Sequence, residues 1–412
     1  MTLMTGKGIA QALTILLTPV ITRLYGPEAF GVLGVFMSIT GLLIGFTSLT
    51  YAMGIVLPKK DEDAKNLVRL CLLIAISVSI LFLIIIGFFQ QPIIKSLKLE
   101  AIQPFILFIP LIFIFSAFEE IFSQWLIRKK KFRQTAKVDI SQSVVQNGSK
   151  VGIGFIHPTS AVLIFTFVFG KFIHAFLLAK SINNKLFQSA KHFLAPDNFK
   201  RKSLIKVAKL YKDFPLYRFP QITLVAFSQN LPVLFLSGLF GPIYAGFYAV
   251  GRKVLVIPTN FISSAIQKAI YPRLADAHQK NEELFPLIWK ATLGLTGIGI
   301  LPLGIIAIFG PSLFSFALGA EWESAGEYAQ WLSIMVFFQF INKPAIAAIP
   351  VLRMQGSLLV YEIVAVVLRV GSLLAGFYIY NNDLVAVALF CVSSSVIYFL
   401  LIVYVIRRAY LS

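Results

Sequence analysis

Twelve long apolar runs constrain this chain more than any other feature of its sequence. A helix needs about 20 mostly apolar residues to cross the hydrocarbon core of a bilayer, and such runs recur along all 412 residues. Only 13% of the residues are charged, which is about half the share in a soluble domain. The sequence therefore predicts an all-α polytopic membrane protein. The predicted spans are 4–24, 30–57, 67–90, 103–127, 138–156, 159–179, 215–240, 243–271, 285–310, 326–349, 357–380 and 383–406.

The loops between these spans form a basic set and a nearly neutral set. Six basic residues lie between Arg128 and Lys137, and the longest polar segment, 181–212, is also basic. Lys and Arg near span ends stay in the cytoplasm, so we expect the basic loops and both termini there. The net charge of +19 then indicates contact with anionic lipid headgroups, and no nucleic-acid partner is expected.

The second half of the chain repeats the first at an offset near 215 residues. LYGPEAFGVL, Leu24 to Leu33, matches LFGPIYAGFY, Leu239 to Tyr248, with the Gly-Pro pairs and Gly31 and Gly246 in register. Each half holds six spans, so the two copies enter the membrane from the same side as parallel repeats. We expect an N-terminal lobe at 1–180, a basic cytoplasmic linker at 181–212 and a C-terminal lobe at 213–412, with substrates bound where the lobes meet.

Two segments carry a family resemblance. ITRLYGPEAFG, Ile21 to Gly31, followed by IVLPKKDEDAKN, Ile55 to Asn66, resembles the opening of polysaccharide transporters, the Wzx-type flippases of lipid-linked oligosaccharides such as O-antigen units. Their superfamily includes multidrug and toxin extrusion antiporters and the lipid II flippase. The resemblance implies two six-helix bundles in a V around a central cavity. It also implies transfer of undecaprenyl-diphosphate-linked sugars from the cytoplasmic to the periplasmic leaflet of a bacterial inner membrane.

Cations inside the spans are the predicted substrate-binding groups. A charged side chain in hydrocarbon is costly, so it usually faces a cavity or a partner, and arginine can donate two parallel hydrogen bonds to a phosphate. Arg218 and Lys290 lie near cytoplasmic span ends, so an alternative to substrate binding is that their side chains snorkel to the membrane interface. Arg23 lies at the outer end of span one, and its alternative role is to anchor the span at lipid headgroups. The predicted set is Arg252, Lys253, Lys171, Lys150, Arg218, Arg23, His174 and Lys290.

Two adjacent carboxylates in span four, Glu119 and Glu120, are candidates for ion coupling. A carboxyl in an apolar setting can exchange a proton near neutral pH. The alternative is pairing with the basic loop that follows the span.

Other intramembrane residues are expected to hold helices together. Uncharged groups such as Thr14 are expected to form hydrogen bonds between helices. GxxxG patterns at 41–45 and 148–152 predict close helix packing, although the motif is common.

Alternative functions make different predictions. A drug antiporter of the same superfamily, coupled to protons or sodium, is the runner-up and should present central carboxylates instead of cations. A glycosyltransferase or polymerase needs a long outward loop, which this chain lacks. No catalytic or cofactor motif occurs, so we expect no enzyme activity, cofactor or metal. A monomer that works with a polysaccharide polymerase and a chain-length regulator is the expected assembly.

Overall fold

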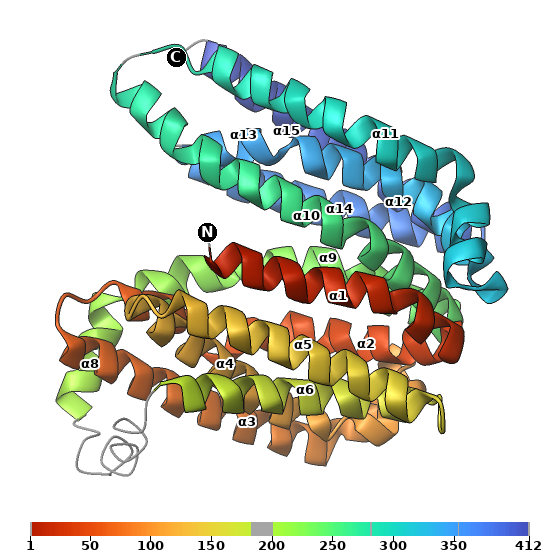
Figure 1. Ribbon diagram of the computed structural model, residues 1–412, viewed down its shortest axis with the longest axis horizontal. Coiled ribbons are helices and arrows are strands. Elements are labelled where there is room, and N and C mark those ends of the chain that lie inside the picture. Colours follow the sequence, from red (N-terminus) through yellow and green to blue (C-terminus); the bar gives the residue numbers. More distant parts are fainter. Residues whose placement is uncertain (1, 183–200, 281, 353, 411–412) are drawn as a thin grey trace. The chain divides into compact units, whose positions relative to one another are not determined.

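The computed structural model describes residues 2–182, 201–280, 282–352 and 354–410 (Figure 1). Within these ranges every regular element is a helix. The chain separates into two compact units. Unit 1 contains residues 1–25 and 32–230, and unit 2 contains residues 26–31 and 231–412.

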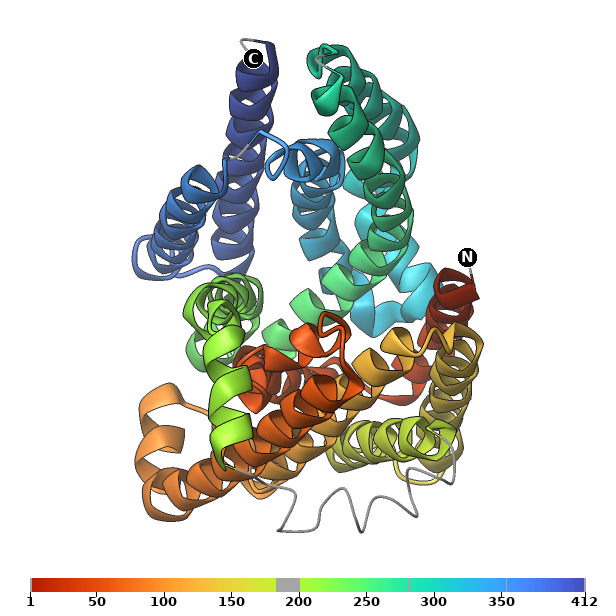
Figure 2. The same ribbon diagram turned by 90° about the vertical axis from the view of Figure 1, so that its left-hand side faces the viewer.

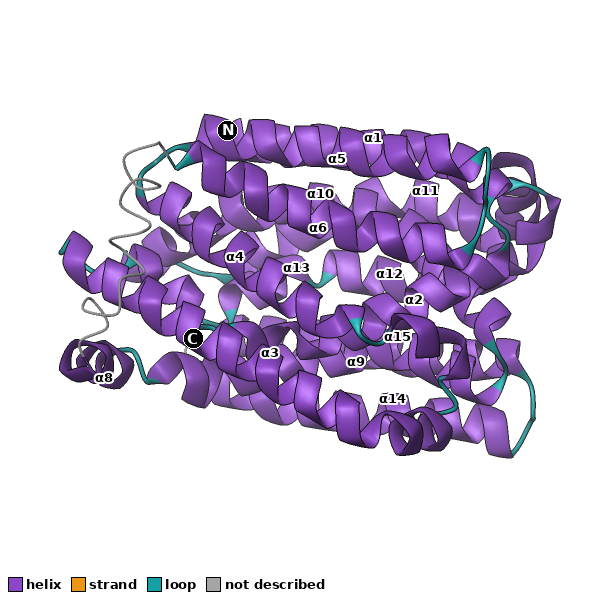
Figure 3. Ribbon diagram, turned by 90° about the horizontal axis from the view of Figure 1, so that it is seen from below, coloured by secondary structure: helices purple, strands orange, loops and turns teal. Residues whose placement is uncertain are grey.

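Unit 1 is a bundle in which α1 packs on α5, α5 on α6, and α6 on α4 (Figures 1 and 3). This order places α4, which carries Glu119 and Glu120, and α5, which carries Asp139, against α6, which carries Lys171 and His174. Its elements, the last of which continues into unit 2, are α1 (Thr2–Leu24), α2 (Pro27–Leu43), η1 (Ile44–Thr47), η2 (Tyr51–Val56), α3 (Asp61–Leu97), η3 (Glu100–Phe105), α4 (Phe108–Arg128), α5 (Phe132–Gly154), α6 (Ser160–Ser181), α8 (Arg201–Leu210), η5 (Phe214–Arg218) and α9 (Phe219–Leu239).

Unit 2 is a second helical bundle. Helix α12 packs on α10, α11 and α15, and α15 also packs on α14. Its further elements are α10 (Pro242–Gln279), α11 (Phe285–Leu318), η6 (Ala320–Trp322), α12 (Glu323–Ile341), α13 (Lys343–Ala348), α14 (Gln355–Tyr378) and α15 (Asp383–Tyr410).

Each of the twelve predicted spans coincides with a helix or a run of consecutive helices, so the all-α polytopic prediction is confirmed. In the part of the chain that the structure describes, nine spans are long and apolar enough to cross a membrane. Helices α1, α5 and α10 are long enough but fall outside this set because polar residues interrupt them. The domain boundaries at 180 and 213 and the central cavity stay predictions, and residues 183–200 of the predicted linker lie outside the described residues.

The predicted span 30–57 is not a single helix. Helix α2 ends at Leu43, and two short 3-10 turns, η1 and η2, complete the span. Between them Leu49 and Thr50 adopt left-handed backbone conformations, with φ of 47° and 62°. Such a conformation costs roughly 1–2 kcal/mol for a non-glycine residue. The Thr50 hydroxyl donates to the Phe214 carbonyl at 3.0 Å, which helps to hold the break in place.

The repeated glycines contact each other's segments reciprocally inside unit 2. A Cβ placed on Gly31 would lie 1.8 Å from the Pro242 carbonyl oxygen, and one on Gly246 would lie 2.0 Å from the Pro27 carbonyl oxygen. Reciprocal contact of this kind is typical of a two-fold-related interface. The sequence repeat is therefore also a packing repeat.

The packing predictions had mixed outcomes. The hydroxyls of Thr14 and Ser143 lie 3.3 Å apart, and the Asn147 amide donates to Thr14 Oγ1 at 3.1 Å, so these residues connect α1 to α5 as expected. The close-packing prediction is wrong for Gly148 and Gly152, because no heavy atom from another described segment would lie within 4 Å of a Cβ on either.

Candidate functional site

Three helices of unit 1 bring five ionisable side chains together. Glu119 and Glu120 lie on α4, Asp139 lies on α5, and Lys171 and His174 lie on α6. A spacing of three residues places Lys171 and His174 on the same face of their helix. The packing of α4 and α5 on α6 then places both basic residues opposite the acidic ones.

The basic and acidic groups form one continuous chain of contacts. Lys171 Nζ lies 2.7 Å from Glu119 Oε2, and the other Glu119 oxygen lies 3.1 Å from His174 Nδ1. The second ring nitrogen, Nε2, lies 3.0 Å from Asp139 Oδ1. The remaining Asp139 oxygen is buried and has no hydrogen-bond partner among the described residues.

His174 contacts a carboxylate through each ring nitrogen. A neutral imidazole carries only one N–H, so two hydrogen bonds to carboxylate oxygens require one further proton within the group. With that proton on the ring, Lys171 and His174 balance Glu119 and Asp139 in charge. The network is therefore suited to hold and exchange a proton.

Glu120 faces a different environment from Glu119. Its Oε2 accepts a hydrogen bond of 3.0 Å from the Ser48 hydroxyl, which belongs to the break in the second span. No ion pair of Glu120 occurs among the described residues. The broken span is thus connected directly to a carboxylate of α4.

A cavity of about 290 Å³ lies against this network and the break. That volume has room for several water molecules. Its polar lining residues are Lys7, Ser48, Thr50, Ser116, Glu119, Glu120, Ser123, Gln124, Asp139, Lys171 and His174. Over the described ranges no cluster of three or more His, Cys, Asp or Glu could hold a metal ion.

Four of the predicted residues meet at this cavity: Glu119, Glu120, Lys171 and His174. The two basic ones are engaged with carboxylates, so a substrate phosphate would have to displace Glu119 to reach Lys171.

The other predicted cations of unit 1 do not line the cavity. Lys150 is buried on α5, and its backbone carbonyl accepts a hydrogen bond of 2.8 Å from the Tyr25 hydroxyl. Arg23 is exposed near the end of α1. Arg218 is exposed and donates to the Gln221 side chain at 2.9 Å.

The remaining predicted cations belong to unit 2. Arg252 and Lys253 are partly buried on α10, and Lys290 is exposed on α11. Arg252 and Arg369 both lie within electrostatic reach of the buried Tyr248 hydroxyl. Arg369 itself donates to the Ser394 hydroxyl at 3.1 Å, and its guanidinium lies over the Tyr398 ring.

Three residues of the site are not among those predicted from the sequence. Asp139 was not among the predicted site residues, although it shares a polar face with Gln142 and Gln146. Ser48 and Thr50 were hidden inside an apparently continuous span. The signal for them was the hydroxyl-rich run TSLT at 47–50, between Gly45 and Gly54.

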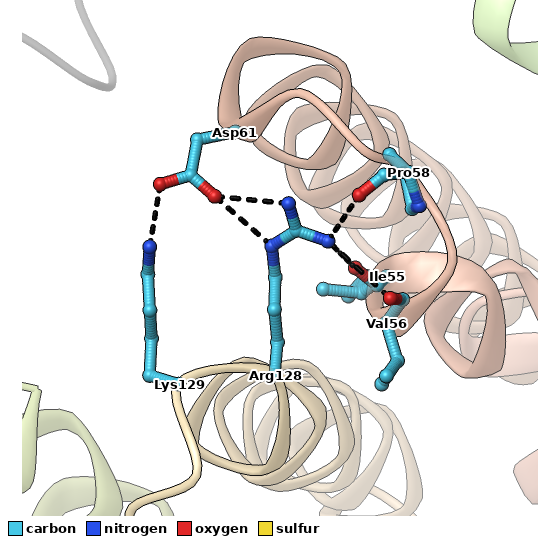
Figure 4. Close-up of polar contacts among 6 residues, drawn as sticks. All are labelled: Ile55, Val56, Pro58, Asp61, Arg128 and Lys129. Carbon is cyan, nitrogen blue, oxygen red and sulfur yellow. Dashed lines mark hydrogen bonds and ion pairs between the residues drawn. The ribbon is translucent and has the colours of Figure 1, made fainter.

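A clamp at one end of the broken span keeps it against α4 (Figure 4). The Arg128 guanidinium donates to the carbonyls of Ile55, Val56 and Pro58 at 3.3, 3.3 and 2.6 Å. The same guanidinium donates to Asp61 at 2.9 and 3.1 Å, and Lys129 pairs with the other Asp61 oxygen. The first two residues of the basic cluster thus join the end of α4 to η2 and to the start of α3.

Several solved structures with this fold are transporters. An inward-facing multidrug resistance MATE family transporter of the MOP superfamily has a TM-score of 0.73 at 14% identity, covering 97% of this chain and 94% of its own. The lipid II flippase MurJ in an inward closed conformation also reaches 0.73, at 10% identity over 98% and 87%. A MOP superfamily transporter from Pyrococcus furiosus scores 0.61 at 14% identity over 99% and 94%.

The chain is therefore a multi-pass membrane protein with the fold that these transporters share. No curated protein matches the sequence. The family model described as "Polysaccharide biosynthesis protein" matches residues 20–327, and the chain belongs to that family. Its fold is the one found in the MATE family transporter and in the lipid II flippase.

Proposed function

We propose that this protein flips undecaprenyl-diphosphate-linked oligosaccharide units, such as O-antigen repeats, from the cytoplasmic to the periplasmic leaflet of a bacterial inner membrane. Alternating access driven by an ion gradient moves the headgroup. Membership of a polysaccharide biosynthesis family supports a glycan substrate, and the likeness to a lipid II flippase supports a fold that can carry a lipid-linked headgroup.

The observation that carries the proposal is the charged network beside the cavity of unit 1. Ionisable residues inside membrane spans are costly and usually mark an ion or substrate pathway. Here Glu119, Lys171 and His174 lie on α4 and α6, both of which are long and apolar enough to cross a membrane. A merely structural role does not account for a cavity with room for water beside them.

We assign proton coupling to this network and to Glu120. Protonation of Glu120 removes a negative charge beside the break while the Ser48 hydroxyl can still donate to it, and so changes the electrostatic balance where the broken span meets α4. The chain from Lys171 through Glu119 and His174 to Asp139 holds a second exchangeable proton, because its geometry already needs one beyond neutral histidine. Binding and release of these protons then bias the unit between two conformations.

We assign the diphosphate to predicted cations that lie outside the network. Arg252 and Lys253 on α10 are the first candidates, since an arginine fork matches phosphate geometry. Lys150, Arg218, Arg23 and Lys290 are secondary candidates for the path of the headgroup. Lys171 and His174 act mainly through Glu119 in this scheme.

The test is genetic and chemical. Deletion of the gene is expected to leave undecaprenyl-linked oligosaccharides on the cytoplasmic leaflet, where a sugar-modifying enzyme added outside spheroplasts does not reach them. The wild-type gene and Lys268→Ala, a control at an exposed lysine on the same helix as Arg252, should restore outside accessibility. Arg252→Ala should not restore it.

The runner-up is proton- or sodium-coupled export of small molecules, which the MATE-like fold also permits. That function predicts drug sensitivity in the deletion strain with no build-up of lipid-linked sugars. Such a result would reject the flippase assignment. A polysaccharide polymerase and a chain-length regulator are the proposed functional partners.

A further inference from the structure

Helix α8 lies across the ends of the spans in its own unit. In Figure 1 the long helices of unit 1 run across the page while α8 runs up the page, and in Figure 3 α8 is seen end-on. Figure 2 gives the same relation, with α8 upright beneath an end-on α9. A helix in this orientation lies parallel to the membrane surface at the level where the spans end.

One face of α8 packs on the protein. Val207 and Leu204 are buried, and Val207 belongs to a hydrophobic cluster with Leu67 of α3 and Trp125 of α4. These partners lie near the start of α3 and the end of α4, the same end as the Arg128 clamp. Helix α8 is therefore fixed beside that end of the bundle.

The opposite face is basic and partly apolar. Lys202, Lys206 and Lys209 are exposed and follow one another at spacings of four and three residues, so they form one stripe. Ile205 and Leu210, 43% and 63% exposed, lie on either side of that stripe. Lysines flanked by exposed apolar side chains are typical of helices that rest in the headgroup region, where the apolar groups enter the acyl boundary and the ammonium groups reach phosphates.

We propose that the outer face of α8 docks on anionic phospholipid headgroups of the leaflet that surrounds the protein, and that this contact sets the position of the broken span beside the cavity. Charge complementarity selects the occupant, since three lysines at an interface favour an anionic over a zwitterionic surface. The exposed apolar flanks favour a lipid surface over a soluble anion.

Two hydrogen bonds connect α8 and its continuation to the break. The Tyr51 hydroxyl of η2 donates to the Ala208 carbonyl of α8 at 3.1 Å. The Thr50 hydroxyl donates to the Phe214 carbonyl just beyond α8 at 3.0 Å. Thr50 and Met53 line the cavity, so a shift of α8 is transmitted to its wall. The functional meaning of this coupling rests on the proposed transport role of the cavity, whereas the lipid contact does not.

Hydrogen–deuterium exchange of the full-length protein in nanodiscs tests both parts without a transport assay. Nanodiscs of phosphatidylcholine alone are compared with nanodiscs that contain about 30% phosphatidylglycerol. We expect the anionic lipid to slow exchange roughly ten-fold in residues 201–213 and, to a smaller extent, in residues 44–56.

Three variants separate the outcomes. Lys202→Gln/Lys206→Gln/Lys209→Gln should lose both lipid effects, and the charge-matched control Lys59→Gln/Lys60→Gln/Lys137→Gln, at exposed lysines elsewhere in unit 1, should keep them. Tyr51→Phe should keep the effect on α8 and weaken the effect on 44–56. Equal exchange in the two lipid compositions, or an unchanged α8 triple variant, would overturn the proposal. The same protection from inorganic phosphate in neutral nanodiscs would assign the face to a soluble anion and would also overturn it.

Discussion

Glu119 is the residue on which the charged network depends, because it contacts both Lys171 and His174. Glu119→Gln removes the counter-charge of two basic groups, so we expect the free energy of unfolding to fall by about 1–3 kcal/mol. The Glu119–Lys171 pair is partly exposed, and the loss should therefore be smaller than for a fully buried ion pair. The midpoint of thermal unfolding in detergent measures the change. Lys171→Met in the same protein should recover part of the loss, giving a coupling energy of about 1 kcal/mol or more in a double-mutant cycle.

Glu120→Gln is the matched control for this prediction. Its hydrogen-bond donor is the neutral Ser48 hydroxyl, which a glutamine oxygen accepts equally well, so stability should change little. A Glu120 variant as unstable as the Glu119 variant, or a cycle with no coupling, would contradict the network as described.

Arg128 is the second residue with a clear energetic role. Its guanidinium satisfies three backbone carbonyls and Asp61, and only 10% of the side chain is exposed. Arg128→Ala leaves these acceptors without their donor, so we expect a loss of about 2–3 kcal/mol in thermal unfolding. Arg133→Ala, at an exposed position of the same basic cluster, should cost less than about 0.5 kcal/mol. Equal effects of the two substitutions would show that the clamp contributes nothing specific.

At the scale of helices, close approach of α2 to α10 depends on two glycines. A methyl group on Gly246 would meet the Pro27 carbonyl oxygen at 2.0 Å. Because backbone atoms on both sides cannot move aside cheaply, Gly246→Ala should destabilise the protein by at least about 1–3 kcal/mol, and Gly31→Ala should do the same. Thermal unfolding and the yield of folded protein report the effect.

Gly294→Ala provides the control with the opposite sign. Among the described residues, no atom from outside its own stretch of helix would lie within 4 Å of the new methyl group, and alanine is favoured over glycine inside a helix by about 1 kcal/mol. The variant should therefore be as stable as the wild type or more stable. A Gly246 variant that behaves like the Gly294 variant would refute the close approach.

At the scale of the whole molecule, the number and direction of the spans can be tested at α5, which falls outside the nine clearly apolar spans of the described chain. A cysteine at Lys130 lies just before this helix and one at His157 just after it, and both positions are exposed. If α5 crosses the membrane, a membrane-impermeant maleimide should label His157→Cys from the periplasm and Lys130→Cys only after the cells are opened. The native Cys71 and Cys391 are buried and should contribute little background.

Ile243→Cys and Lys280→Cys apply the same test to the two ends of α10. Both positions are exposed, and the expected labelling is periplasmic for the first and cytoplasmic for the second. Labelling of both members of either pair from one side would reject the twelve-span topology.

Much of the architecture followed from hydrophobic run length, because a bilayer crossing demands about 20 apolar residues whatever their partners. The same reasoning located Glu119, Glu120, Lys171 and His174, since ionisable residues stand out against an apolar background. It failed at residues 44–56, where the composition stays apolar but the backbone leaves the helix. Hydrogen bonds from Ser48 to Glu120 and from Thr50 to Phe214 hold that break, and their partners lie 72 and 164 residues away.

The sequence by itself determined that this chain is a helical membrane protein with an internal repeat and charged residues inside its spans, because the cost of burying polar groups in lipid is a local property that each segment carries alone. Only the tertiary structure decided which charges meet. No acidic residue lies near Lys171 in the sequence, yet the packing of α4 on α6 places a carboxylate 2.7 Å from its ammonium group. Electrostatic interactions depend on distance in space, and that distance exists only after the helices have packed.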